Sequence, residues 1–190
     1  MKRACLSLLA FVLAMSPALA SAANSSTAPK APEIGAIAPM ALGKDGKSKE
    51  INLADHRGKV VIVTFWASWC GYCLKELPAL NELQVKAGDQ WLKIIAVNVQ
   101  DENTAYRAMT KQMRDYRIVL ARDRSGEIAA TYGVRAYPNL WMIDPQGRIA
   151  SHHVGYGEDS LKSIINEIKR LLTEEMHRQQ GQAAQAATGS

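Results

Sequence analysis

The chain has 190 residues, of which 47% are hydrophobic and 22% are charged. These proportions fit one globular domain, and they exclude a wholly disordered chain, a polytopic membrane protein and a small scaffold held by disulfides. Without Lys2 and Arg3, which lie in a segment argued below to be removed, 21 basic residues face 18 acidic ones and no run of five basic residues remains. This charge pattern does not indicate a surface that binds nucleic acid.

The first 22 residues have the pattern of a secretory signal peptide. A cationic start is followed by the apolar residues 4–15, by Ser16-Pro17 and by small residues that permit cleavage after Ala20 or Ala22. We therefore expect a cleaved signal peptide over 1–22 and a soluble, periplasmic mature protein. An uncleaved anchor is the alternative, but the apolar stretch is shorter than the ~20 residues that span a bilayer.

The mature chain divides by composition into three parts. An Ala/Ser/Pro-rich flexible leader is expected over 23–33, a folded domain over 34–177 and a disordered Gln/Ala/Gly-rich tail over 178–190. Because Cys5 lies within the signal, the mature protein keeps only Cys70 and Cys73, in an oxidising compartment.

Strands and helices alternate along the domain. Two short strands around a polar turn come first, and β-branched and aromatic runs then predict two buried strands with an amphipathic helix between them. Residues 103–116 predict a helix, 117–121 a short strand and 127–132 a helical turn or two. The strand ranges of the first half are 39–42, 50–53, 59–66 and 91–99.

The last third predicts a hairpin and a closing helix. Apolar runs at 139–143 and 149–154 flank the turn Asp144-Pro145-Gln146-Gly147. A helical stripe of leucines and isoleucines then runs from Leu161 to Leu172. Together these elements predict an α/β fold, with a mixed sheet covered on both faces.

The chemistry is expected at Trp69-Cys70-Gly71-Tyr72-Cys73. A two-residue spacer at the start of a helix lets the two sulfurs meet as a dithiol or a disulfide. The unsatisfied N–H groups and positive dipole end of that helix favour a thiolate at Cys70 and lower the pKa of its thiol. Cys70 is therefore expected to be the attacking thiol and Cys73, facing Leu77 and Leu80, the buried resolving thiol.

Other uses of the cysteine pair are less favoured. A static disulfide would close a loop of only about four residues and would gain little from loop entropy. Zinc would need further ligands from His56, His152, His153 or His177, and adjacent histidines on a strand point to opposite faces. Haem attachment needs a histidine directly after the second cysteine, where Leu74 stands.

The segment FWASWCGYC at 65–73 resembles the active site of thioredoxin-fold proteins, and LKELPAL after it is similar to exported TlpA/ResA-type thiol-disulfide oxidoreductases. The resemblance runs from about Gly35 to Leu172. It includes the Ala-Pro-Met-Ala-Leu phrase at 38–42, a helix proline at Pro78 and the Tyr-Gly-Val-x-x-x-Pro phrase at 132–138. It implies a thioredoxin-like fold with an N-terminal β-hairpin extension, and a cis proline at Pro138 beside the sulfurs.

The sequence departs from thioredoxin at three points. Thr64 stands where thioredoxin has a buried aspartate, and Ala96 where it has a lysine, so a proton relay on those groups is lost. Glu76, one turn after Cys73, is the candidate substitute, with a solvated helix glutamate as the alternative. The Gly71-Tyr72 spacer resembles that of DsbC-type isomerases, but residues 21–58 leave no room for their dimerisation domain.

The expected function is an exported thiol-disulfide oxidoreductase that reduces disulfides in partner proteins. A disulfide oxidant or isomerase is the first alternative, and a Cu(I) metallochaperone using the same thiols is the second. Trp69, Tyr72 and Tyr137 are expected either to contact an extended peptide beside Pro138 or to shield the sulfurs.

The cysteine pair carries the electrons, so no cofactor and no metal are expected. The expected partners are a disulfide-containing exported protein, such as apocytochrome c, a copper-site protein or a mispaired periplasmic protein, and a membrane electron donor of the DsbD/CcdA kind. A monomer that binds no nucleic acid is expected.

Overall fold

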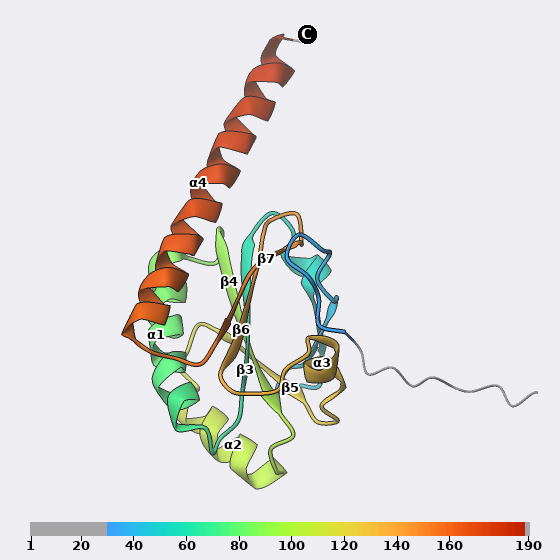
Figure 1. The fold of residues 1–190 in the computed structure, drawn as a ribbon, viewed down its shortest axis with the longest axis vertical. Helices are drawn as coiled ribbons and strands as arrows, with labels where there is room; N and C mark the ends of the chain where they lie inside the picture. The colour runs from blue at the N-terminus through green and yellow to red at the C-terminus, as the bar shows by residue number, and fades with distance from the viewer. Residues whose placement is uncertain (1–29, 189–190) are drawn as a thin grey trace, which may run out of the picture.

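The computed structural model describes residues 30–188, so the expected signal peptide and most of the leader lie outside the described residues. The elements are those of an α/β protein with a seven-stranded sheet (Figure 1). They are β1 (Ala41–Lys44), β2 (Glu50–Asn52), η1 (Leu53–His56), β3 (Val60–Trp66), α1 (Gly71–Ala87), β4 (Leu92–Val99), α2 (Asn103–Gln112), β5 (Val119–Asp123), α3 (Glu127–Thr131), β6 (Asn139–Ile143), β7 (Ile149–Val154) and α4 (Glu158–Thr188).

The sheet has the strand order β2-β1-β5-β4-β3-β6-β7. Strands β3, β4 and β5 are parallel, whereas the β1–β2 hairpin at one edge and the β6–β7 hairpin at the other are antiparallel. Parallel neighbours bring their carboxyl ends to the same edge of the sheet. The loops that follow β3 and β4 therefore lie next to each other.

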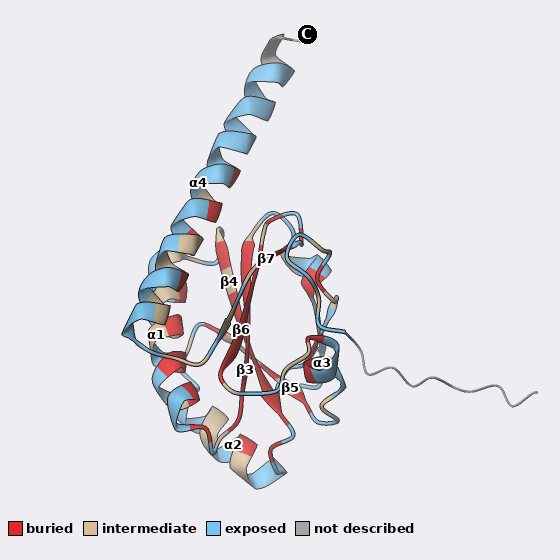
Figure 2. Cartoon of the chain, viewed as in Figure 1, coloured by how far each residue is buried: buried red, intermediate tan, exposed pale blue. Residues whose placement is uncertain are grey.

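Two hydrophobic layers sandwich the sheet. Along β3, Val60, Ile62 and Trp66 pack on the side of α1 and α4, while Val61, Val63 and Phe65 pack toward α3 and η1. All seven residues of β3 are buried, and the centre of the sheet is the most buried part of the molecule (Figure 2). The β-branched run thus forms a strand covered on both faces, as predicted.

Most elements agree with the sequence prediction, and the two strands of the β6–β7 hairpin have the predicted bounds. Helix α1 begins at Gly71, between the cysteines, and α2 ends at Gln112 rather than at 116. No helix within 30–188 is long and apolar enough to cross a membrane.

The expectation of a disordered tail from residue 178 is wrong for the described residues, because α4 continues to Thr188 and projects beyond the sheet (Figure 1). Ala and Gln are good helix formers, and extending an existing helix avoids the cost of a new nucleus. Near residue 177, where the domain was expected to end, α4 is tied to the β6–β7 turn. There the buried Glu175 accepts a hydrogen bond of 3.1 Å from Gln146 Nε2.

Candidate active site

The two cysteines lie at the start of α1, after the loop that follows β3, and their sulfurs form a disulfide. Cys70 is the N-cap of α1, and the backbone N–H of Cys73 donates to Cys70 Sγ across 3.1 Å. Cys70 keeps 7% of its surface exposed while Cys73 is fully buried. The helix start thus supplies a hydrogen-bond donor to the more accessible of the two sulfurs.

A buried carboxyl group lies one helical turn beyond Cys73. Glu76 has no exposed surface, and its Oε2 accepts a hydrogen bond of 2.7 Å from the Thr64 hydroxyl. Its other oxygen has no hydrogen-bond partner among the described residues, and burial raises the pKa of Glu76 to about 7. The solvated alternative for this residue is therefore wrong.

Thr64 is fully buried on β3. It lies opposite Ala96 on β4 and Leu140 on β6 in the middle of the sheet. No lysine therefore faces the carboxyl group from the neighbouring strand, and the Thr64 hydroxyl is its hydrogen-bonding partner.

The loop before β6 carries a cis peptide bond between Tyr137 and Pro138, as the resemblance implied. The ring of Tyr137 meets that of Trp69 edge-to-face, with centroids 5.7 Å apart. Trp69 is 74% exposed and Tyr72 is 62% exposed, while Tyr137 is half-buried. Two large aromatic side chains thus stand in solvent on either side of Cys70 in the sequence.

Sequence reasoning missed an acidic residue at the same edge of the sheet. Asp101 follows β4 and is 8% exposed, and its Oδ2 accepts the backbone N–H of Ser68, two residues before Cys70. The sequence did contain a signal for Asp101, because it is a polar residue that comes just after a buried strand. Such a residue lies beside the loop that follows the neighbouring parallel strand. The structure identifies that neighbouring strand as β3, which pairs with β4.

Residues 34–152 match the AhpC/TSA family. The chain belongs to this family. Among named relatives, it is 37% identical to the thiol-disulfide oxidoreductase ResA of Bacillus thuringiensis, over 74% of this chain and 79% of that one. It is 31% identical to the ResA of Geobacillus thermodenitrificans, over 77% of this chain and 84% of that one.

Solved structures agree with this assignment. A crystal structure assigned to the thiol:disulfide interchange protein DsbE of Chlorobium tepidum superposes with a TM-score of 0.66 at 30% identity, covering 75% of this chain and 99% of that one. The exposed lipoprotein thioredoxin Etrx1 of Streptococcus pneumoniae gives 0.60 at 32% identity, over 70% of this chain and all of the other. The protein is thus a ResA-like thiol-disulfide oxidoreductase with a thioredoxin-like fold.

One of the two adjacent histidines of this oxidoreductase is held by ring stacking and a hydrogen bond. His152 stacks on Trp141 with ring centroids 3.8 Å apart and hydrogen-bonds to Asn139 Oδ1 at 2.9 Å. Desolvation lowers the pKa of both His152 and His153. Within residues 30–188, no cluster of three or more His, Cys, Asp or Glu side chains is arranged to hold a metal ion.

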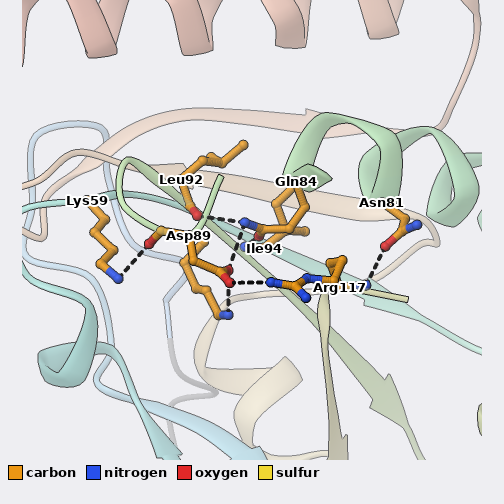
Figure 3. A network of polar contacts seen from close by, with 8 residues as sticks. Lys59, Asn81, Gln84, Asp89, Leu92, Ile94 and Arg117 are labelled. Atoms are coloured by element: carbon orange, nitrogen blue, oxygen red, sulfur yellow. Dashed lines mark hydrogen bonds and ion pairs between the residues drawn. The ribbon is translucent and has the colours of Figure 1, made fainter. Parts of the chain in front are cut away.

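The far end of α1 is fixed by a polar network (Figure 3). Gln84 donates to Leu92 O at 2.8 Å and accepts the Ile94 N–H at 2.7 Å, which joins the helix to β4. Asp89, in the turn after α1, pairs with Lys93 at 3.1 Å and with Arg117 at 3.2 Å. These contacts hold the carboxyl end of the helix whose amino end carries the cysteines.

Proposed function

We propose that the protein is an exported, periplasmic protein-disulfide reductase in which Cys70 is the nucleophile and Cys73 the resolving thiol. The observation that carries the proposal is the Cys73 N–H donated to Cys70 Sγ at the start of α1. A sulfur in that position is stabilised as a thiolate by the helix N-terminus. Its 7% exposure, against none for Cys73, supports the same order of roles.

The reaction is a pair of thiol-disulfide exchanges. In the reduced protein, the Cys70 thiolate attacks one sulfur of a substrate disulfide and releases the other as a thiolate. Cys73 then attacks Cys70 Sγ, which frees the second substrate sulfur. Two electrons pass to the substrate, and the protein is left with the Cys70–Cys73 disulfide.

Glu76 is proposed to accept the proton that the Cys73 thiol must lose before it attacks. The two residues lie three positions apart on α1, which places their side chains on one face of the helix. A carboxyl group with a pKa of about 7 exchanges protons near neutral pH. Burial supports this role, because neither Cys73 nor Glu76 has any exposed surface.

The substrate is proposed to be a protein segment that lies across the exposed aromatic side chains. Trp69 and Tyr72 offer apolar surface beside Cys70, and Tyr137 joins Trp69 to the cis-proline loop at Pro138. Apocytochrome c, a copper-site protein or a mispaired periplasmic protein would each present such a segment.

A reductase that works among oxidants must be reduced again after each turnover. The proposed donor is a membrane protein of the DsbD/CcdA kind that meets the same face of a monomeric protein around Cys70. Cleavage of the predicted signal over 1–22 would leave the mature protein in the compartment where such a donor delivers its electrons.

The test combines activity with the redox state in cells. We expect the purified dithiol protein to reduce insulin with dithiothreitol as the electron source, and acid-trapped cells to contain mainly the dithiol form. A protein found mainly as the disulfide, and able to oxidise a reduced peptide, would instead establish the oxidant. Stoichiometric copper after purification, with no insulin reduction, would establish the metallochaperone.

A further inference from the structure

The loop from Ala67 to Cys70 presents the attacking sulfur, and a residue of another loop holds it. Within the loop, the Cys70 N–H donates to Ala67 O at 3.1 Å. The Ser68 N–H points out of this turn to Asp101 Oδ2, 2.7 Å away. The contact joins the loop after β3 to the loop after β4.

The carboxylate that receives Ser68 is itself fixed. Asn98, fully buried on β4 opposite Trp66, donates its Nδ2 to the same Asp101 Oδ2 at 2.7 Å. The backbone carbonyl of Asp101 accepts a hydrogen bond of 2.6 Å from the Arg122 guanidinium. Both the side chain and the main chain of Asp101 are therefore anchored to the sheet.

The backbone just before Asp101 adopts a conformation that side chains disfavour. Gln100 has φ of 56°, in the left-handed region, although it is not a glycine. Its N–H donates to Asp123 O at 3.0 Å and its Nε2 to Ser125 O at 3.1 Å, which hold the turn. Such conformations persist where the surrounding structure requires them, and this one turns Asp101 back toward Ser68.

We infer that Asp101 is a positioning residue for the oxidoreductase reaction: its carboxylate holds the loop before Cys70 so that the sulfur stays at the N-cap of α1. The inference rests on the proposed role of Cys70 as nucleophile. If the loop is released, Cys70 Sγ spends less time within reach of the Cys73 N–H. The thiolate then loses stabilisation, and the reactivity of Cys70 at neutral pH falls.

The matched pair of variants is Asp101→Ala and Asp101→Asn. A single oxygen of Asp101 accepts both Ser68 N–H and Asn98 Nδ2, so the one amide oxygen of asparagine can replace it. Asp101→Asn therefore keeps the contact and removes the charge, whereas Asp101→Ala removes both. Asp89→Ala is the control, because it removes a carboxylate that forms ion pairs with Lys93 and Arg117 at the other end of α1 (Figure 3).

The readout is the rate at which iodoacetamide alkylates Cys70 in the reduced, full-length protein at pH 7 and pH 9, with the site identified by mass spectrometry. For Asp101→Ala we expect a rate about threefold or more below wild type at pH 7 and a similar rate at pH 9, where the thiol ionises in either protein. Asp101→Asn and Asp89→Ala should stay within about twofold of wild type at both values. Glu76 also titrates in this range, so each rate is taken as a ratio to wild type at the same pH.

Four results would each contradict one part of the proposal, and they are distinguishable. Wild-type alkylation at Cys73 before Cys70 would overturn the proposed nucleophile. Equal rates for Asp101→Ala and wild type at pH 7, or equal losses for Asp101→Ala and Asp101→Asn, would overturn the positioning role. Hydrogen exchange in the wild type needs no variant, and rapid exchange of the Ser68 amide would overturn the contact itself.

Discussion

The Thr64 hydroxyl donates a hydrogen bond of 2.7 Å to the Glu76 carboxyl group in the interior of the protein. Within residues 30–188, this hydroxyl is the one hydrogen-bond partner of the carboxyl group, and Glu76 Oε1 is unpaired. A neutral carboxylic acid tolerates such a site far better than a carboxylate does. The arrangement explains why the pKa of Glu76 is raised, and it links the stability of the fold to pH.

The first prediction concerns this linkage. The pKa of Glu76 is about 7 in the folded protein against an ordinary 4.5, so the unfolded chain ionises first as the pH rises. The contribution of neutral Glu76 to stability is complete below about pH 4.5 and is lost by about pH 7, a change of about 3 kcal/mol. Glu76→Gln should remove this dependence.

Urea unfolding at pH 5 and pH 8 measures the effect. The variant should gain stability relative to wild type between these two values, by up to about 3 kcal/mol. Thr64→Val serves as the control, because it removes the hydroxyl but leaves the titrating group in place. An identical loss of stability in wild type and Glu76→Gln would show that Glu76 is ionised throughout.

The second prediction separates the two sulfurs. Cys70→Ser should abolish insulin reduction, because the nucleophile is gone. Cys73→Ser should accumulate mixed disulfides with substrate proteins, because nothing resolves them. Non-reducing electrophoresis and mass spectrometry of each variant from cells detect the adducts, with the double variant as control. Adducts that form on Cys73 in Cys70→Ser would reverse the assignment.

The third prediction tests the aromatic contact between Trp69 and Tyr137. Tyr137→Ala should raise KM for a protein substrate about tenfold, which corresponds to about 1.4 kcal/mol of lost contact. Tyr137→Phe keeps the ring against Trp69 and should behave as wild type. Steady-state kinetics with a protein substrate and with a small disulfide distinguish a ring that contacts the substrate from a ring that shields the sulfurs. Loss of a shielding ring would change the kinetics with both substrates alike.

The fourth prediction is the reduction potential, for which we expect about −250 to −200 mV. The Gly71-Tyr72 spacer lacks the rigid Gly-Pro of thioredoxin, and the thiolate of Cys70 is stabilised at the helix N-terminus, so the protein should be more oxidising than thioredoxin. Tyr72 carries no positive charge, which keeps the potential below that of DsbA. Equilibration with glutathione buffers measures it, and a value above about −150 mV would favour the oxidant.

The local features of this fold are readable from the sequence. The run from Val60 to Trp66 predicts a buried strand, because a short run rich in β-branched and aromatic residues is typical of a strand covered on both faces. The β6–β7 hairpin was equally clear, since Asp144 to Gly147 has turn chemistry between two apolar runs. The position of the cysteine pair at a helix start followed from the change of period after Cys73.

Features that depend on distant contacts were not readable. In the sequence, Glu76 looks solvated because it lies between leucines that are spaced by three. In the structure, α1 packs against both the sheet and α4, and the buried face of the helix is wide enough to include Glu76. Asp101 could be placed beside Ser68 only once β3 and β4 were known to pair. The helical tail was missed because a Gln/Ala/Gly-rich composition does not show that the predicted closing helix continues beyond its apolar stripe.

The donor that serves Cys70 Sγ belongs to the main chain of Cys73 and not to any side chain. The two residues of the spacer, Gly71 and Tyr72, are both exposed, and a Cβ added at Gly71 would meet no atom within 4 Å. Substitutions of the spacer side chains therefore leave the hydrogen bond from the Cys73 N–H to Cys70 Sγ in place. Under the proposed function, substitutions at these two positions can therefore change the recognition surface and the reduction potential while the main-chain donor to the nucleophile stays in place.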